Sequence, residues 1–283
     1  MSSIKNVAVV GASGSIGSHA VPALLAAHFV VTIITHCSEG KYFPPQVKVA
    51  VTDFSPQSLQ QVLSGQDAVL CVLGHATLDR QTDTIHAAEK AGVKRFIPSD
   101  FGAPKGPNDV PEYRAILGKK AQALDLLKEK AKNGNFTWTS FFNGPLLCRQ
   151  HSATIYDSGN EPFTAMSIAK IGKPIAAVFK HPEETKNRHV NIAALTTSQR
   201  KILGELEKQT STEWKTTTVS TDEARREGRI KLRDGDYKGA YVAFLVTQLY
   251  QDGAGMSVLD GADYDLLGAE KESLKDIVKG VLT

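Results

Sequence analysis

Short aliphatic or β-branched runs alternate with amphipathic stretches along the first half of the chain. The runs that we expect to form strands are residues 7–10, 30–35, 47–51, 68–73 and 95–98. The stretches with helical character between most of them are residues 15–27, 56–64 and 80–91. Strands that alternate with helices imply right-handed crossovers and a parallel sheet covered by helices on both faces. The pattern therefore predicts a doubly wound α/β domain.

Glycine and proline residues refine this prediction. Gly65 and Gly92 follow two of the predicted helices, where helix C-termini commonly place a glycine. Pro22 falls near the middle of the first predicted helix, where a proline removes a backbone hydrogen bond and costs roughly 3 kcal/mol or kinks the helix. We expect this helix to form without being straight.

The pattern loosens in the second half. A long helix over residues 112–132 precedes a strand at 136–142, and a further strand is expected at 189–192. Later helices are expected at 196–210, with Thr196 or Thr197 as its cap, and at 237–250 and 273–282. We place a domain boundary near Asn143-Gly144-Pro145, so that residues 1–145 form one domain and residues 146–283 a smaller α+β region. Strands of this second region are free to return to the first sheet.

Composition excludes several classes of protein. The 283 residues carry a net charge of only +3, which gives no reason to expect nucleic acid or an anionic membrane as a partner. The three cysteines are widely spaced and suit a reducing cytosol. No signal-peptide core precedes the first strand, and no apolar run approaches about eighteen residues. These features predict a soluble cytoplasmic protein. The histidines lack metal-ligand spacing, so we expect no metal.

The segment GASGSIG follows the first predicted strand and opens the first predicted helix. In this context one glycine makes the tight turn, one lets a pyrophosphate approach the backbone, and one lets helix pack on strand. The helix N-terminus offers free N–H groups to phosphate. We therefore expect a dinucleotide site, with a plain turn as the alternative. Its loop residues are Gly11, Ser13, Gly14, Ser15, Ile16 and Gly17.

The end of the second predicted strand indicates which dinucleotide. An NAD site usually has Asp or Glu there to hold the ribose 2′-hydroxyl, but no carboxylate appears before Glu39. The neutral or cationic side chains that could face a 2′-phosphate are Thr35, His36, Ser38 and Lys41. We therefore expect NADPH. After the third strand, Asp53 and Phe54 should lie beside the adenine, and Asp53 is also suited to cap a turn.

Lys120 is the candidate acid–base group. None of the seven tyrosines has a lysine four residues later, so the usual short-chain dehydrogenase pair is missing. At about 100° per residue, Lys120 lies within the apolar stripe of the long helix, whereas Lys119 lies at its edge. A lysine amine that loses hydration favours its neutral form and can exchange a proton near neutral pH. Alternatively, Lys120 extends to solvent or pairs with a carboxylate.

Other candidates lie where strands end. Gly74 and His75 should lie near the nicotinamide ribose, although a loop histidine is as often a surface residue. Ser99 either binds the cofactor or holds loop backbone, and Asn143 either contacts the nicotinamide or holds the Gly144-Pro145 turn. The residues assigned to the substrate are Phe101, Phe142, Pro145 and His151, with packing as the alternative for the phenylalanines.

GASGSIG, SGQDAVLCVLG, AGVKRFIPSDFG, the Lys120 helix and FFNGP together resemble the NmrA-like, isoflavone reductase-like family of atypical short-chain dehydrogenases, in particular its fungal members. The match is specific over residues 5–145 and looser afterwards. The resemblance implies an NAD(P)-binding Rossmann domain (residues 1–145), a substrate-binding region (residues 146–283), NADPH as cofactor, and Lys120 as the acid–base group.

The sequence also departs from the family. His36 stands where the family commonly has arginine, so the grip on a 2′-phosphate and the preference for NADPH could be weaker. The segment after Pro145 is short, and it usually walls the substrate pocket. We expect a cytoplasmic reductase, monomeric or homodimeric, for a small conjugated, aromatic or polyketide-like substrate of secondary metabolism. The alternatives are a cofactor-sensing regulatory protein and a non-redox isomerase or cyclase.

Overall fold

The computed structural model describes residues 3–74, 77–102, 111–144, 146–147, 154–255 and 257–282. Among these residues, eight strands form one sheet in which every pairing is parallel. The strands are β1 (Asn6–Val10), β2 (Val30–Thr35), β3 (Lys48–Val51), β4 (Ala68–Cys71), β5 (Arg95–Ile97), β6 (Phe101–Gly102), β7 (Thr137–Phe142) and β11 (Arg188–Asn191). Their order is β11-β7-β5-β4-β1-β2-β3, and β6 pairs with β7.

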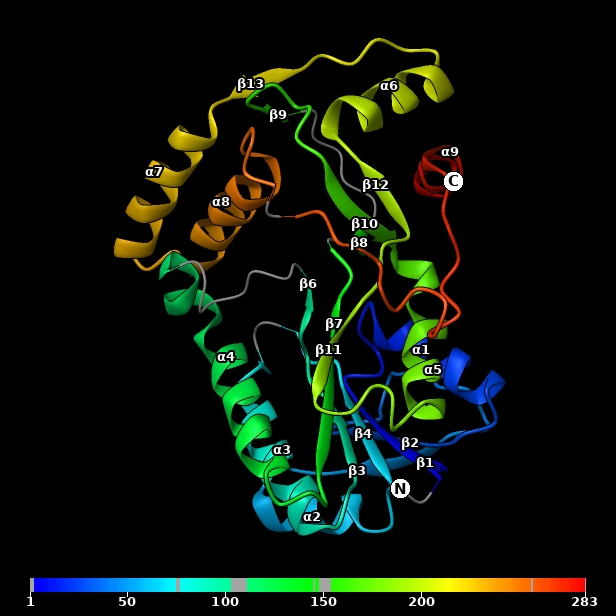
Figure 1. Cartoon of the computed structure of the whole chain (residues 1–283). Coiled ribbons are helices and arrows are strands. Elements are labelled where there is room, and N and C mark those ends of the chain that lie inside the picture. The colour runs from blue at the N-terminus through cyan, green and yellow to red at the C-terminus, as the bar shows by residue number, and fades with distance from the viewer. Residues whose placement is uncertain are drawn as a thin grey trace.

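Helices cover both faces of this sheet (Figure 1). One face carries α1 (Gly17–Ala26) and α5 (Gly172–Lys180), and the other carries α2 (Pro56–Leu63), α3 (Arg80–Lys90) and α4 (Pro111–Ala131). Alternate residues of β1 belong to the two cores: Val7 and Val9 to the first, Ala8 and Val10 to the second. The predicted doubly wound α/β fold is confirmed.

Most of the second half lies beyond the carboxyl edge of the sheet (Figure 1). A three-stranded sheet has the order β12-β10-β8, and β13 pairs with β9. These elements are β8 (Leu146–Leu147), β9 (Thr154–Tyr156), β10 (Phe163–Ser167), β12 (Leu195–Thr197) and β13 (Thr217–Val219). The helical elements are η2 (Ile168–Lys170), α6 (Gln199–Thr210), α7 (Thr221–Arg233), α8 (Tyr237–Tyr250) and α9 (Leu274–Leu282).

Two sequence-based expectations about caps and boundaries were wrong. Thr196 and Thr197 do not cap α6, because they belong to β12, where Thr197 is paired with Phe163. Ser198 caps the helix instead, and its hydroxyl accepts the Lys201 N–H at 3.4 Å. The strand expected at 68–73 ends at Cys71. Pro22 stays inside α1 on an exposed position, so the helix continues past it.

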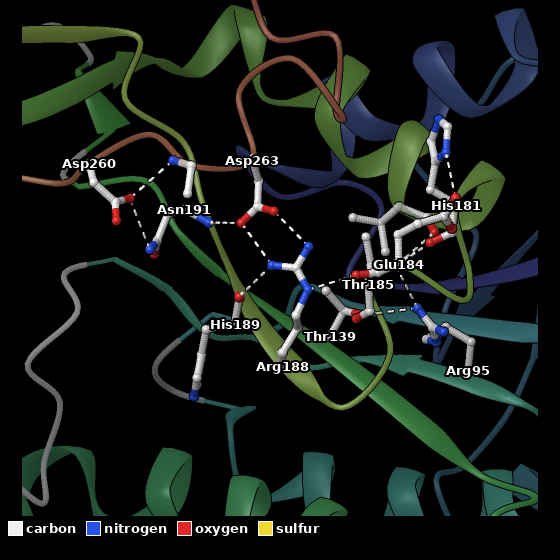
Figure 2. A network of polar contacts seen from close by, with 12 residues as sticks. Arg95, Thr139, His181, Glu184, Thr185, Arg188, His189, Asn191, Asp260 and Asp263 are labelled. Atoms are coloured by element: carbon white, nitrogen blue, oxygen red, sulfur yellow. Dashed lines mark hydrogen bonds and ion pairs between the residues drawn. The ribbon is translucent and has the colours of Figure 1, made fainter.

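The second half is tied to the main sheet through β11, which pairs with β7 (Figure 2). The Arg188 guanidinium donates to both carboxylate oxygens of Asp263, at 2.9 and 2.6 Å. The same carboxylate accepts the Asn191 N–H at 2.8 Å, and Asp263 is buried. Asp263 therefore fastens the segment before α9 to the edge strand of the main sheet.

Replacing Asp263 by alanine is expected to lower the free energy of unfolding by about 2 kcal/mol, because a charged acceptor of three hydrogen bonds is lost and the part-buried Asn191 N–H loses its partner. Chemical denaturation followed by circular dichroism measures the change. Asp265→Ala is the control, because this carboxylate is exposed two residues away. Equal stability of the two variants would contradict the fastening role.

A buried arginine joins β5 to β7 and to the loop before β11 (Figure 2). Arg95 has no exposed surface and donates to the hydroxyls of Thr137, Thr139 and Thr185, each at 2.9 Å, and to the Pro182 carbonyl. Burial lowers the pKa of Arg95 to about 10, since the charged form loses hydration. Its donors therefore fix the strands that carry Ser99 and Asn143 at their ends.

Candidate functional site

The three glycines of the first loop are each close to backbone. Gly11 has φ +91°, and a Cβ on it would lie 2.5 Å from the Val72 carbonyl oxygen. A Cβ on Gly17 would lie 2.5 Å from the Gly11 oxygen. The Gly14 N–H donates to that same oxygen at 3.0 Å, which closes the turn. Gly11 and Gly17 are therefore required by the loop itself, whereas Gly14 is exposed.

The start of α1 is suited to bind an anion. Ile16 occupies the cap position without a side-chain cap, and the first turn contains no acidic residue. Ser13, Gly14 and Ser15 are exposed just ahead of it. The first N–H groups of a helix lack intrahelical partners and carry partial positive charge. This loop fits the pyrophosphate of a dinucleotide, because it offers donors and a backbone without side-chain cover.

The end of β2 brings together two of the residues expected at a 2′-phosphate. The Lys41 ammonium donates to the Thr35 hydroxyl at 3.1 Å, and that hydroxyl donates to the Cys37 carbonyl at 2.8 Å. His36 is exposed between them along the chain. Glu39 is exposed. The donors present are cationic or neutral, which suits a phosphate better than a hydroxyl that needs an acceptor.

Asp53 and Phe54 form the turn after β3. The Asp53 carboxylate accepts the Ser55 N–H at 2.8 Å, and hydrogen bonds from Ser55 hold the pKa of this exposed carboxyl below its usual value. Phe54 has φ +64°, and its N–H donates to the Thr52 hydroxyl at 3.0 Å. Asp53 thus has the turn role that the sequence predicted as its second possibility.

Ser99 holds loop backbone. Its hydroxyl accepts the Leu73 N–H at 2.8 Å and donates to the Cys71 carbonyl at 3.0 Å. Its own N–H donates to the Gln81 side-chain oxygen at 2.6 Å. Of the two readings of Ser99, the loop-holding one is therefore present, and it fixes the backbone that leads to Gly74, which is exposed.

Asn143 shows one satisfied and one unsatisfied polar group. Its side-chain N–H₂ donates to the Gly144 carbonyl at 2.8 Å, so it holds the turn. Its side-chain oxygen has no partner, although the residue has no exposed surface. A buried acceptor without a donor costs free energy. The oxygen lies at the carboxyl end of β7 and lacks the donor that a buried acceptor requires.

Lys120 lies on the inner side of α4. Ala123 and Leu127, one and two turns further along, have no exposed surface and pack with Phe136 and Trp138. Lys120 is half-buried, whereas Lys119 is exposed. Because α4 runs back from the carboxyl edge, Lys120 lies closer to that edge than Ala123. Lys120 therefore occupies the side of α4 that carries the buried Ala123 and Leu127, as the sequence pattern predicted.

Phe101 and Phe142 lie on opposite faces. The Phe101 ring stacks on Phe141, with centroids 5.1 Å apart and an interplanar angle of 12°. Phe142 follows Phe141 in β7 and therefore points to the other face, which is the face of α4. It stacks on His189, with centroids 4.3 Å apart. Both rings pack as the alternative reading expected, and only Phe142 shares a face with Lys120.

His189 contacts Ser140, Phe142 and Trp138 and turns away from the Arg188–Asp263 pair (Figure 2). Burial lowers the pKa of His189, the Asp100 carboxylate raises it, and Lys128 on α4 lowers it. The folded protein therefore prefers the neutral His189 ring. The resulting contribution to the free energy of unfolding is complete above the ordinary pKa of 6.5 and is lost as pH falls through the lower pKa of the folded state.

The free energy of unfolding is therefore expected to fall less between pH 7 and 5 in His189→Gln than in the wild type. Denaturant titrations at several pH values measure this difference. His86→Gln is the matched control, because His86 is exposed on α3. An identical pH dependence in His189→Gln and wild type would show that the ring does not titrate against folding.

Several expected site residues lie outside the described residues: His75, Pro145 and His151. One buried polar residue was not expected. Gln81 is 1% exposed, accepts the Ser99 N–H, and has a side-chain N–H₂ without a partner. It lies on the inward stripe of α3 with Thr84, Ile85 and Ala88. Gln81 could have been found from the sequence, because it is a polar residue at a position where the predicted helix has its apolar side.

Within the described ranges, no group of three or more His, Cys, Asp or Glu side chains is placed to hold a metal ion. The same part of the chain contains no helix with the length and apolar character needed to span a membrane.

The fold is similar to solved reductases. It superposes on leucoanthocyanidin reductase from Vitis vinifera in complex with NADPH with a TM-score of 0.77, at 15% identity over 98% of this chain and 99% of that one. It superposes on an isoflavone reductase with a TM-score of 0.75, at 17% identity over 98% and 99% of the two chains. The expected Rossmann-like fold is confirmed.

The sequence is similar to a fungal protein. It is 36% identical to oxidoreductase poxI of Penicillium oxalicum over 96% of this chain and 92% of that protein. The expected class of oxidoreductase and the expected resemblance are both confirmed. A family model described as the NmrA-like family matches residues 3–227. With a model over most of its length and this relative over nearly all of it, the chain belongs to the NmrA-like family.

Proposed function

We propose that this protein is an NADPH-dependent reductase for a small conjugated, aromatic or polyketide-like substrate, with Lys120 as general acid. The observation that carries the proposal is the glycine loop at α1, where Gly11 and Gly17 have no room for a Cβ and the exposed Gly14 leaves backbone donors uncovered. The NADPH in the similar leucoanthocyanidin reductase supports the same cofactor.

The residues that would hold the cofactor lie along the carboxyl edge. Residues 13–17 would take the pyrophosphate, and Thr35, His36 and Lys41 the 2′-phosphate. Asn143 would accept an N–H of the carboxamide through its unpartnered oxygen. Ser99 supports the site from behind, through Leu73 and Cys71. When bound, the reduced dinucleotide supplies a hydride to an electrophilic carbon.

Lys120 would hold the proton of the reaction. Charge develops on the substrate oxygen as the neighbouring carbon is reduced, and a positioned ammonium stabilises that charge and then donates its proton. The packed Ala123 and Leu127 fix the helix that carries it. Phe142, on the same face, is the better candidate for an aromatic contact, and the names of the similar structures include isoflavone and leucoanthocyanidin.

Residues 1–145 would form the dinucleotide-binding domain and residues 146–283 the substrate-binding region, with β11 and α5 packed into the first domain. A cytoplasmic location suits the free thiols of Cys37 and Cys71.

Calorimetry with NADPH, NADP⁺ and NADH, followed by a panel of enones, quinones and aromatic ketones monitored by NADPH absorbance, tests the proposal. Binding of NADPH in preference to NADH, with oxidation by at least one panel member, supports it. Equal affinity for oxidised and reduced cofactor without oxidation would favour a regulatory sensor. Product formation without net oxidation would favour an isomerase or cyclase.

A further inference from the structure

An arginine lies over an aromatic ring at the carboxyl edge of the sheet. The Arg80 guanidinium carbon is 4.7 Å from the centre of the Phe54 ring. Arg80 is the first residue of α3, which follows β4, and Phe54 lies in the turn between β3 and α2. Helices α2 and α3 pack side by side, which brings these two residues together from different crossovers.

Phe54 is held firmly in place. Its backbone adopts the left-handed conformation, φ +64°, which is unfavourable for an aromatic residue and is secured by the 3.0 Å hydrogen bond to Thr52. The Thr52 hydroxyl also contacts the Ser58 hydroxyl of α2 at 2.8 Å. The ring packs against the core under α2 and α3. It therefore offers a fixed surface to whatever lies on it.

Arg80 has no carboxylate partner among the described residues, although Asp79 and Asp83 are close to it in sequence. Its guanidinium lies over the Phe54 ring, and the side chain is half-buried. A guanidinium is planar and weakly hydrated, so it can stack on one ring while its other face stays open to a second planar group. This cation is thus oriented by an aromatic ring and is left without a paired charge.

We propose that Arg80 and Phe54 form the adenine-binding surface of the cofactor site, with the guanidinium stacked between the Phe54 ring and the base. This inference rests on the proposed function. The strand order β4-β1-β2-β3 places the turn after β3 on the same side of the glycine loop as Thr35 and Lys41. The phosphorylated ribose and its base belong on that side, because the nicotinamide half would lie at the opposite side, beside Asn143.

The test is calorimetry with three ligands: NADPH, adenosine 2′,5′-bisphosphate, and reduced nicotinamide mononucleotide, which lacks the adenosine half. Arg80→Ala is expected to weaken binding of the first two by the same factor, about twofold to thirtyfold, the range of a cation–π contact. Binding of the mononucleotide is expected to stay unchanged. Unchanged binding of all three ligands by Arg80→Ala would overturn the inference.

Two further variants separate stacking from charge. Arg80→Lys keeps the charge but loses the planar group, so it is expected to recover little of the affinity. Two results would assign Arg80 to the 2′-phosphate and overturn the stacking role. One is full recovery of NADPH affinity by Arg80→Lys. The other is that Arg80→Ala weakens binding of NADPH but not of NADH, which has no 2′-phosphate. Phe54→Asn removes the ring, and asparagine tolerates the left-handed backbone. The double variant Phe54→Asn/Arg80→Ala should bind NADPH no more weakly than Arg80→Ala alone, because the two residues act as one surface.

Controls make the outcomes separable. Arg226→Ala removes an exposed arginine on α7 and should bind all three ligands as the wild type does. Thermal unfolding of each variant checks that the fold is retained. If the wild-type protein binds neither NADPH nor the bisphosphate, the proposed function fails and this inference with it. If the wild type binds both and Arg80→Ala binds them equally well, only this inference fails.

Discussion

Lys120→Ala is expected to lower kcat by about two to four orders of magnitude, the usual contribution of a positioned general acid, while NADPH binding is retained. The physical reason is the placement of Lys120 on the inner side of α4, half-buried and one turn nearer the carboxyl edge than the fully buried Ala123. Truncation leaves the developing charge on the substrate oxygen without a donor. Single-turnover kinetics with the active panel substrate measure the chemical step directly.

The neighbouring lysine provides the matched control. Lys119 is exposed on the same helix, so Lys119→Ala removes the same charge from the same element without changing the inner side. It should retain wild-type turnover. Turnover by Lys120→Ala within tenfold of the wild type, with NADPH still bound in calorimetry, would remove Lys120 from the mechanism.

The helices and strands of the first half could be predicted from the sequence, because the hydrophobic residues of each follow one dominant period. The run 30–35 is aliphatic or β-branched throughout and forms β2 with the predicted bounds. Buried parallel strands read as continuous apolar runs because helices cover both of their faces. Gly65 and Gly92 likewise adopt positive φ, +77° and +80°, just after α2 and α3. Local signals and tertiary packing agree in this region.

The second half was less readable because tertiary pairing decides its elements. Thr196 and Thr197 were expected at the start of a helix, yet they pair with β10 as part of β12. Helix α7 is mostly polar, and its buried side consists of the small residues Thr221, Ala224 and Gly228, which give only a weak helical signal in the sequence. This side packs on α8. A single sequence carries no signal for contacts of this kind.

For the site, the sequence revealed backbone requirements better than side-chain partnerships. The spacing of the glycines predicted the tight turn at Gly11 and the close approach of helix and loop at Gly17. The apolar stripe predicted that Lys120 shares a side of α4 with the buried Ala123 and Leu127. The contact of Arg80 with Phe54 and the bond between Gln81 and Ser99 join separate crossovers. Such pairs depend on how α2 and α3 settle on the sheet, which no local pattern encodes.

Gly14→Ala is expected to weaken NADPH binding by on the order of tenfold to a hundredfold while the free energy of unfolding stays within about 0.5 kcal/mol of the wild type. Gly14 is exposed, and a Cβ on it would lie 3.3 Å from the Gly11 oxygen and 3.8 Å from that of Val72. The folded protein can accommodate this atom with a small shift. A pyrophosphate that must approach the Gly14 backbone would collide with this Cβ, so the substitution weakens NADPH binding rather than folding.

Gly17→Ala should show the opposite pattern. Its Cβ would lie 2.5 Å from the Gly11 oxygen and 2.6 Å from the Ala12 Cα, so the helix must move away from the loop at a cost of about 1–3 kcal/mol in stability. Gly204→Ala is the control, because nothing lies within 4 Å of that position and alanine is the better helix former. Calorimetry and denaturation on the three variants separate the roles. If Gly14→Ala binds NADPH as tightly as Gly204→Ala does, the loop is an ordinary turn and the dinucleotide site must lie elsewhere.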